Sequence, residues 1–248
     1  MMNLFFNSLS SVISNPVETI QLRDILIEIY GQSNAVGQGG VTIPDPKYIS
    51  PVNSFILGQS YAGDDNIDTF TQLTKGVSSL GNQFGSELSL AYDLGGGYYC
   101  KVAKDGASIL NLSKVTDDVY PLMLAKLQLA LNQREFKKIV LWYDQWEGDS
   151  LTTTADYVAR FKQLIIDFET DIGKPIDCIL VQKARDEGGS DYSDILAANN
   201  ELTTFYNGRY KYIDNDDVPR YDAFHYTPEG YITIGERVAA EIKLKFGL

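Results

Sequence analysis

The segment Ile25-Leu26-Ile27-Glu28-Ile29-Tyr30-Gly31-Gln32-Ser33-Asn34 lies near the start of a chain of 248 residues. Its first part is apolar except for one glutamate, which predicts a strand that is buried on both faces. Gly31 ends the strand, and glycines on both sides of Ser33 permit a tight turn. Ser33 is therefore expected at the carboxyl end of the strand, where a nucleophile would be exposed. The alternative is an ordinary turn, because Gly, Ser and Asn are common turn residues.

The rest of the chain alternates short apolar runs with longer segments of helical periodicity. Further strands are expected at 54–57, 98–103, 138–143 and 177–182, and helices at 85–94, from 120, at 153–172 and from 227 to the C-terminus. This alternation predicts one α/β domain in three α/β/α layers with a mostly parallel central sheet. Residues 39–80 are rich in Pro, Gly, Asp and Ser, and are expected to form loops over one end of the sheet. Such loops would be natural walls of a binding pocket.

The composition is that of a globular protein with an acidic balance. The hydrophobic content is 44%, and the formal net charge is −12. A negative surface repels phosphate backbones and anionic lipids, so neither nucleic acid nor a membrane is an expected partner. Cys100 and Cys178 both lie in apolar runs and are expected to be buried core residues rather than a disulfide or a metal pair. With one histidine in the chain, no metal site and no cofactor are expected.

The first residues of the chain, 1–22, are mildly apolar and contain no Lys or Arg. A secretory leader normally begins with positive charge, so this segment is not expected to be one. No run approaches the roughly eighteen apolar residues that a membrane span needs. Composition does not distinguish a cytoplasmic protein from one carried on a larger extracellular assembly, and it does not indicate an oligomeric state.

The single histidine, His225, lies three residues after Asp222 and just ahead of the final predicted helix. Histidine is the usual general base at neutral pH, and a neighbouring carboxylate can orient it. A lone histidine is more often structural than catalytic. The presence of Ser33 after the first strand makes the catalytic interpretation the better one, since the three side chains together form a catalytic set.

These two motifs together resemble the SGNH hydrolase superfamily, and within it the sialate O-acetylesterase-like carbohydrate esterases. That group opens with Gly-Gln-Ser-Asn after the first strand and closes with Asp-x-x-His before the last helix. Phe84-Gly85-Ser86-Glu87 is similar to the family's Phe-Gly-Pro-Glu turn, with serine in place of proline, and residues 106–108 are similar to its small-residue loop. The resemblance covers nearly the whole chain from Ile25. It implies a flavodoxin-like SGNH hydrolase catalytic domain at 23–248 after an N-terminal extension at 1–22.

The family's Trp-x-Gln-Gly-Glu-x-Asp block has a less regular counterpart at residues 142–149. Matching its glutamine to Gln145 requires one extra residue after Trp142, and puts Trp146 where the family has glycine. Without the insertion, Asp144 would take the position of the oxyanion donor. An ionised aspartate has no proton to donate, so Gln145 is the expected donor and Asp144 the alternative. Trp146 is expected either to stack on a sugar ring or to pack in the core.

The resemblance implies a serine esterase that removes O-acetyl groups from a carbohydrate through an acyl-enzyme. Ser33 is the expected nucleophile, His225 the base and Asp222 the residue that orients it. The expected oxyanion donors are the backbone N–H groups of Ser33 and Gly85 and the side chain of Gln145, and the expected substrate-binding residues are Gln32 and Trp146.

Two other functions are compatible with the sequence. One is a short-chain acyl esterase or a lipase-like member of the same superfamily, although no amphipathic surface helix or basic patch suited to a lipid interface is evident. The other is a carbohydrate-binding relative that has lost activity, which the irregular block around Trp146 would allow. A binding module has no chemical need for serine, aspartate and histidine together, so the esterase is the preferred hypothesis.

Overall fold

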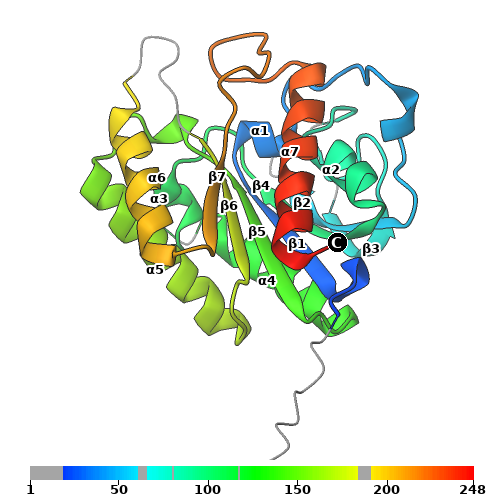
Figure 1. The fold of residues 1–248 in the computed structure, drawn as a ribbon, viewed down its shortest axis with the longest axis horizontal. Coiled ribbons are helices and arrows are strands. Elements are labelled where there is room, and N and C mark those ends of the chain that lie inside the picture. Colours follow the sequence, from blue (N-terminus) through cyan, green and yellow to red (C-terminus); the bar gives the residue numbers. More distant parts are fainter. Residues whose placement is uncertain (1–18, 61–65, 80, 117, 184–190) are drawn as a thin grey trace, which may run out of the picture.

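The structure, a computed structural model, describes residues 19–60, 66–79, 81–116, 118–183 and 191–248. A seven-stranded sheet forms its centre, with helices on both faces (Figure 1). The strands are β1 (Ile25–Gly31), β2 (Ser54–Ser60), β3 (Asn66–Gln72), β4 (Gly97–Ala103), β5 (Lys138–Asp144), β6 (Cys178–Gln182) and β7 (Tyr210–Ile213). Their order is β3-β2-β4-β1-β5-β6-β7, and every neighbouring pair is parallel except β2 and β3. The predicted three-layer α/β/α fold with a mostly parallel sheet is confirmed.

The strand β1 lies at the centre of this sheet, and all of its residues are buried. Gly31, its last residue, is in register with Ala103 of β4 on one side and with Asp144 of β5 on the other. The three strands therefore end level with one another, and the loops that follow them meet at one end of the sheet. In an open parallel sheet this end is where ligands bind.

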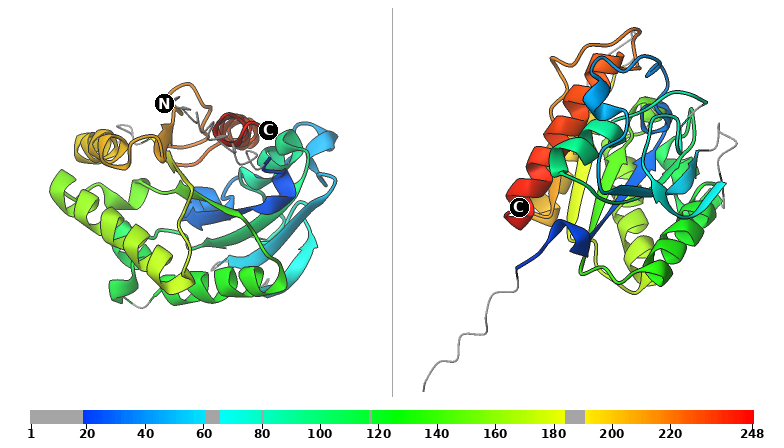
Figure 2. Two further views of the ribbon diagram at one scale, coloured as in Figure 1. Left: turned by 60° about the horizontal axis from the view of Figure 1, so that its bottom comes forward. Right: turned by 90° about the vertical axis from the view of Figure 1, so that its right-hand side faces the viewer.

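Helices form two layers, one on each face of the sheet. The helices are α1 (Ser33–Val36), α2 (Glu87–Leu94), α3 (Ile109–Leu112), α4 (Tyr120–Gln133), α5 (Thr154–Ile172), α6 (Ser193–Tyr206) and α7 (Pro228–Phe246). The core on one face includes side chains of α3, α4, α5 and α6, and the core on the other includes those of α1, α2 and α7. Figure 2 (left) shows α4 and α5 on one side of the sheet and α7 on the other. None of the helices among the described residues is both long and apolar enough to cross a membrane.

Side-chain caps set the starts of the two longest helices. The Thr153 side chain accepts a hydrogen bond from the backbone N–H of Asp156 at the start of α5. At the start of α7, the Thr227 side chain accepts from the N–H of Gly230, and Pro228 occupies the first helical position. These caps satisfy N–H groups that have no partner within the helix.

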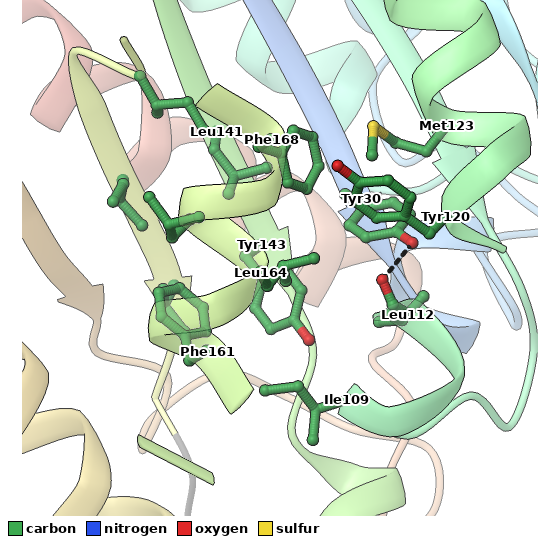
Figure 3. Close-up of a cluster of buried hydrophobic side chains, with 14 of the residues drawn as sticks. Tyr30, Ile109, Leu112, Tyr120, Met123, Leu141, Tyr143, Phe161, Leu164 and Phe168 are labelled. Atoms are coloured by element: carbon green, nitrogen blue, oxygen red, sulfur yellow. Dashed lines mark hydrogen bonds between the residues drawn. The ribbon is translucent and has the colours of Figure 1, made fainter. Parts of the chain in front are cut away.

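Aromatic side chains fill the core between the sheet and the helices α4 and α5 (Figure 3). Tyr30 of β1 packs edge-on against Phe168 of α5, and its hydroxyl donates a 2.7 Å hydrogen bond to the backbone oxygen of Leu112. Tyr143 of β5 packs in the same way against Phe161. The hydrogen bond from Tyr30 to Leu112 fixes α3, and with it the loop after β4, against the centre of the sheet. Cys100 and Cys178 are both free and buried, as expected.

The sequence predicts that residues 39–80 form loops that line a pocket. The structure differs from this prediction. The segment contains β3, an antiparallel edge strand whose residues are mostly exposed, as well as β2. One of its loops packs against α7, where Tyr48 donates a 2.8 Å hydrogen bond to Glu236. Three elements, β3, β7 and α6, were not expected from the sequence.

Glu28 is the one acidic residue of β1, and it is completely enclosed by the core. Among the described residues, neither of its carboxyl oxygens has a hydrogen-bond partner. Burial raises the pKa of Glu28 well above its ordinary value, and the nearby Cys100 thiol offsets this only in part. Glu28 is therefore a neutral acid over a wide pH range, and a source of instability in the centre of the sheet.

Replacing this residue, Glu28→Leu, is expected to raise the free energy of unfolding at pH 7 by about 1 to 3 kcal/mol, because no unpaired polar group remains at this position. The unfolded chain releases this proton near pH ~4.3 whereas the folded chain keeps it, so wild-type stability should fall as the pH rises above that value. Urea unfolding at pH 5 and pH 8 measures both effects. Glu28→Gln is the control, which removes the ionisation but keeps a polar group. A leucine variant less stable than wild type at pH 8 would contradict the prediction.

Candidate active site

Ser33 is the first residue of α1 and follows β1 after a single intervening residue, Gln32. The turn depends on glycine, because a Cβ at Gly31 would lie 2.1 Å from the backbone oxygen of Asp144. Gly37 ends α1 in the left-handed conformation, with φ of +91°. The backbone N–H of Ser33 has no acceptor within its own helix, because the first N–H groups of a helix never do. The chain thus presents both the hydroxyl and the N–H of Ser33 at the end of the sheet.

The Asp222 and His225 side chains lie on a tight hairpin just before α7. Arg220 and Tyr226 pair as an antiparallel bridge, and the N–H of Tyr221 donates to the backbone oxygen of His225 at 3.1 Å. Within this hairpin the Nδ1 atom of His225 lies 2.8 Å from Oδ2 of Asp222. The other carboxylate oxygen accepts 2.7 Å hydrogen bonds from the N–H groups of Phe224 and His225. Asp222 therefore holds both the imidazole ring and its backbone.

These contacts favour the ionised form of Asp222. Partial burial acts to raise its pKa, but the hydrogen bonds from the His225 ring and from the two backbone N–H groups outweigh that effect. The pKa of Asp222 is consequently below its ordinary value. An ionised carboxylate at Nδ1 selects the tautomer in which Nδ1 carries the proton and Nε2 is free to accept one.

A cavity of about 220 Å³ brings the two motifs together. Its lining includes Ser33 and Gln32 from the turn after β1, and His225 and Phe224 from the hairpin before α7. The loops after β4 and β5 complete it, with Asp105, Gly106, Glu147 and Gly148. No described residue of 39–79 belongs to this lining, so the pocket walls come from other loops than the sequence suggested.

Asn34 connects the parts of this site that are far apart in the sequence. Its side-chain nitrogen donates to Glu147 Oε1 at 2.5 Å and to the backbone oxygen of Phe224 at 3.0 Å. Its side-chain oxygen accepts a 3.0 Å hydrogen bond from the Tyr231 hydroxyl of α7. The residue next to Ser33 thus fixes the loop after β5, the hairpin of His225 and the last helix at once.

Glu147 is the half-buried carboxyl group at the centre of these contacts. Its carboxylate also accepts hydrogen bonds from the side chains of Gln32, at 2.5 Å, and Gln182, at 3.2 Å. Burial raises the pKa of Glu147, whereas the charge of Arg220 and the hydrogen bonds from Asn34 and Gln182 act to lower it. Glu147 was matched to the family block in the sequence but was given no role. The structure makes it the acceptor that orients Gln32 and Asn34 on either side of Ser33.

Two of the predicted oxyanion donors have other partners in the structure. The N–H of Gly85 donates a 2.9 Å hydrogen bond to Glu87, which also forms a buried ion pair with Lys101. The Gln145 side-chain nitrogen donates to the backbone oxygen of Ala107 at 2.8 Å and to Asp149 at 3.0 Å. Neither residue lines the cavity of Ser33 and His225. The backbone N–H of Gly85 and the side chain of Gln145 thus hold the loops around the site, with their hydrogen bonds directed to protein acceptors.

Asp144, the alternative to Gln145, is also outside the lining of the cavity. It is buried, and neither of its carboxyl oxygens has a hydrogen-bond partner among the described residues. Burial and the nearby Glu147 raise the pKa of Asp144 well above its ordinary value. The raised pKa favours the protonated form of Asp144, but this residue does not belong to the cavity wall.

Trp146 does not provide the sugar-stacking face that was one of its two expected roles. The side chain is completely buried and packs edge-on against Tyr192, with ring centres 4.6 Å apart. The guanidinium of Arg220 lies 5.4 Å from its ring centre. A ring without an exposed face cannot stack on a substrate, so the interpretation as a core residue is the correct one.

Gly106 was named in the sequence only as part of a small-residue loop, but the structure places it in the cavity. The turn 104–107 closes with a hydrogen bond from the N–H of Ala107 to the backbone oxygen of Lys104, and Gly106 adopts a φ of +66°. In the part of the chain that the structure describes, its own N–H has no hydrogen-bond acceptor. The position of this loop, directly after the neighbour of β1, is the signal that could have identified it.

The comparison with protein families agrees with this fold. A carbohydrate esterase class is indicated, and the chain belongs to the family described as carbohydrate esterase, sialic acid-specific acetylesterase, whose model matches residues 23–243. No curated protein matches the chain in a sequence search.

Several solved structures share the fold at low sequence identity. A protein from Arabidopsis thaliana is 19% identical, with a TM-score of 0.67 over 89% of this chain and 98% of that one. A carbohydrate acetylesterase from Xanthomonas citri is 15% identical, with a TM-score of 0.62 over 90% of this chain, which spans only 57% of that enzyme. A family two carbohydrate esterase from Clostridium thermocellum, in complex with cellohexaose, is 15% identical, with a TM-score of 0.52 over 93% of this chain and 67% of that one. At these identities the likeness establishes the fold alone.

Proposed function

We propose that the protein is a serine esterase that removes O-acetyl groups from a carbohydrate. The observation that carries this proposal is the cavity that Ser33 and His225 both line, with Asp222 Oδ2 held 2.8 Å from Nδ1 of the imidazole. Nucleophile, base and orienting carboxylate are the parts that acyl transfer needs. Membership of a carbohydrate esterase family supports the carbohydrate as the substrate.

In the proposed reaction, the Ser33 hydroxyl oxygen attacks the carbonyl carbon of the acetyl ester while Nε2 of His225 takes the hydroxyl proton. The tetrahedral intermediate then collapses, the sugar alkoxide leaves, and His225 returns the proton to it. Water next attacks the acetyl group on Ser33, with His225 again acting as base, and acetate is released. Asp222 stabilises the imidazolium that forms in both steps, because its carboxylate is ionised and hydrogen-bonded to Nδ1.

The negative oxygen of the intermediate requires donors close to Ser33. We assign this role to the backbone N–H groups of Ser33 and Gly106, in place of Gly85 and Gln145. Both residues line the cavity, and Gly106 leaves its N–H without another acceptor in the described structure. Removing one donor of this kind typically costs about 10² to 10³ in turnover. Gln32, whose amide is fixed by Glu147, is proposed to form the floor against which the ester rests.

A series of esters with increasing acyl length tests the acetyl part of the proposal. The cavity is small, about 220 Å³, so hydrolysis should be fastest for p-nitrophenyl acetate. A methylene group that does not fit the cavity weakens binding of the transition state. We therefore expect kcat/KM to fall by about tenfold or more between acetate and octanoate. A rate that rises toward octanoate would favour the lipase-like alternative. Acetate release from acetylated xylan and from acetylated sialate then identifies the sugar.

A further inference from the structure

A second cavity adjoins the candidate active site and shares one residue with it. Its volume is about 300 Å³, and Gly148 lies in the lining of both cavities. The remaining walls come from the start of α3, the loop that leads into α5, and the first turns of α5. A cavity of this volume falls at the lower end of the range found for small-molecule sites, roughly 300 to 1,000 Å³.

The glycine at this shared wall allows an unusually close approach between two loops. A Cβ at position 148 would lie 2.4 Å from the backbone oxygen of Ala107, which belongs to the loop after β4. The backbones at positions 107 and 148 are therefore in close contact, and Gly148 is the one residue that the linings of both cavities share. A glycan that occupied both cavities would cross only this contact.

The second cavity offers apolar surface together with a charged donor and a charged acceptor. Leu151, which is 99% exposed, and Leu110, which is 37% exposed, provide the apolar part. Arg160 and Asp156, one helical turn apart on α5, provide the charges. Arg160 forms neither an ion pair nor a hydrogen bond with any other residue that the structure describes, although its charge acts to lower the pKa of Asp149.

This combination matches the chemistry of a neutral sugar ring. A pyranose has an apolar C–H face, and its hydroxyl groups both donate and accept hydrogen bonds. A guanidinium supplies five donors and a carboxylate supplies acceptors only, so the pair can serve neighbouring hydroxyls of one ring. The charges of Asp156 and Asp149 offset that of Arg160, which leaves no excess of positive charge for an anionic sugar.

From these observations we infer that this second cavity is a sugar subsite, which binds the ring next to the acetylated one in the same neutral glycan. The inference rests on the proposed function for the assignment of the first cavity. The binding of a sugar ring at Arg160, in contrast, can be measured without any hydrolysis.

The test combines kinetics with direct binding. Wild type, Arg160→Ala and Arg23→Ala are compared on p-nitrophenyl acetate and on acetylated xylohexaose. Arg23→Ala is the matched control, because it removes an exposed guanidinium at the amino end of β1, opposite the site. We expect Arg160→Ala to raise KM for the oligosaccharide by about tenfold, without a change on p-nitrophenyl acetate, since hydrogen bonds to a charged group are lost. The control should behave as wild type on both substrates, and thermal unfolding confirms that each variant folds.

Calorimetric titration with unacetylated xylohexaose separates this inference from the proposed function. Binding by wild type that Arg160→Ala weakens about tenfold supports the subsite, even if no ester is hydrolysed. A different result would overturn the subsite and leave the esterase proposal intact. In that case esters are hydrolysed, xylohexaose does not bind, and Arg160→Ala has the same KM as wild type for acetylated xylohexaose. Tighter binding of hexagalacturonate than of xylohexaose would overturn the assignment to a neutral glycan.

Discussion

Replacing the candidate nucleophile, Ser33→Ala, is expected to lower kcat on p-nitrophenyl acetate by about 10³-fold or more. The substitution removes the oxygen that forms the acyl-enzyme, and the remaining groups supply only residual stabilisation of the intermediate. The fold should be unaffected, because the hydroxyl lies at the cavity and the turn depends on Gly31 and Gly37 instead. Initial rates and a thermal unfolding curve for each variant provide the measurement.

The histidine offers an independent check on the same assignment. His225→Ala should lower kcat to a similar extent, and the double variant Ser33→Ala/His225→Ala should be no slower than either single one, because the two groups act as a unit. The control is Ser193→Ala, which removes an exposed hydroxyl at the start of α6. Hydrolysis by Ser33→Ala at the wild-type rate would refute the proposed nucleophile.

The second large effect is expected from Asp222→Asn, with a loss of about 10³ to 10⁴ in kcat. An amide can donate a hydrogen bond to Nδ1, and this would stabilise the tautomer whose Nε2 carries a proton and cannot act as a base. The variant also loses the charge that stabilises the imidazolium. Kinetics from pH 4 to 9 give the measurement, and Asp167→Asn, within α5, is the control for loss of one negative charge.

The sign of the pH effect follows from the pKa of Asp222, which folding lowers. A group of this kind contributes stability that is present above its unfolded pKa, near ~3.9, and is lost as the pH falls through the folded value. Wild type should therefore lose this contribution only at acid pH, and Asp222→Asn should lack it throughout. If the two proteins lose stability in parallel below pH 4, Asp222 is not held by His225 as described.

Sequence patterns predicted the centre of this fold because its strands are long and almost entirely apolar. β1, β4 and β5 each appear as an apolar run, and Thr153 and Thr227 mark the starts of α5 and α7 by their capping chemistry. The edges of the fold lack these signals. β3 is polar and exposed, β7 has four residues, and α6 carries several Asn and Thr residues. Their positions are determined by contacts with β2, β6 and α5, which no local pattern encodes.

The candidate site shows the same division between local and non-local information. Ser33, Asp222 and His225 are each fixed by neighbours in the sequence, so short motifs could identify them. The partner of Gln145 could not be predicted, because the backbone oxygen of Ala107 comes within reach of its side chain only once the chain has folded. Trp146 was ambiguous for a similar reason, since its burial depends on Tyr192 and Arg220, which lie far along the sequence.

The close contact between Gly148 and Ala107 has a consequence for how the enzyme could change during evolution. Gly148 is the one residue that the linings of the catalytic cavity and the proposed subsite share, so the route from one to the other crosses this single backbone contact. Any side chain introduced at position 148 would push the loop after β4 away from the loop after β5. Such a substitution would change which glycans can occupy both cavities, while Ser33, Asp222 and His225 stay unchanged.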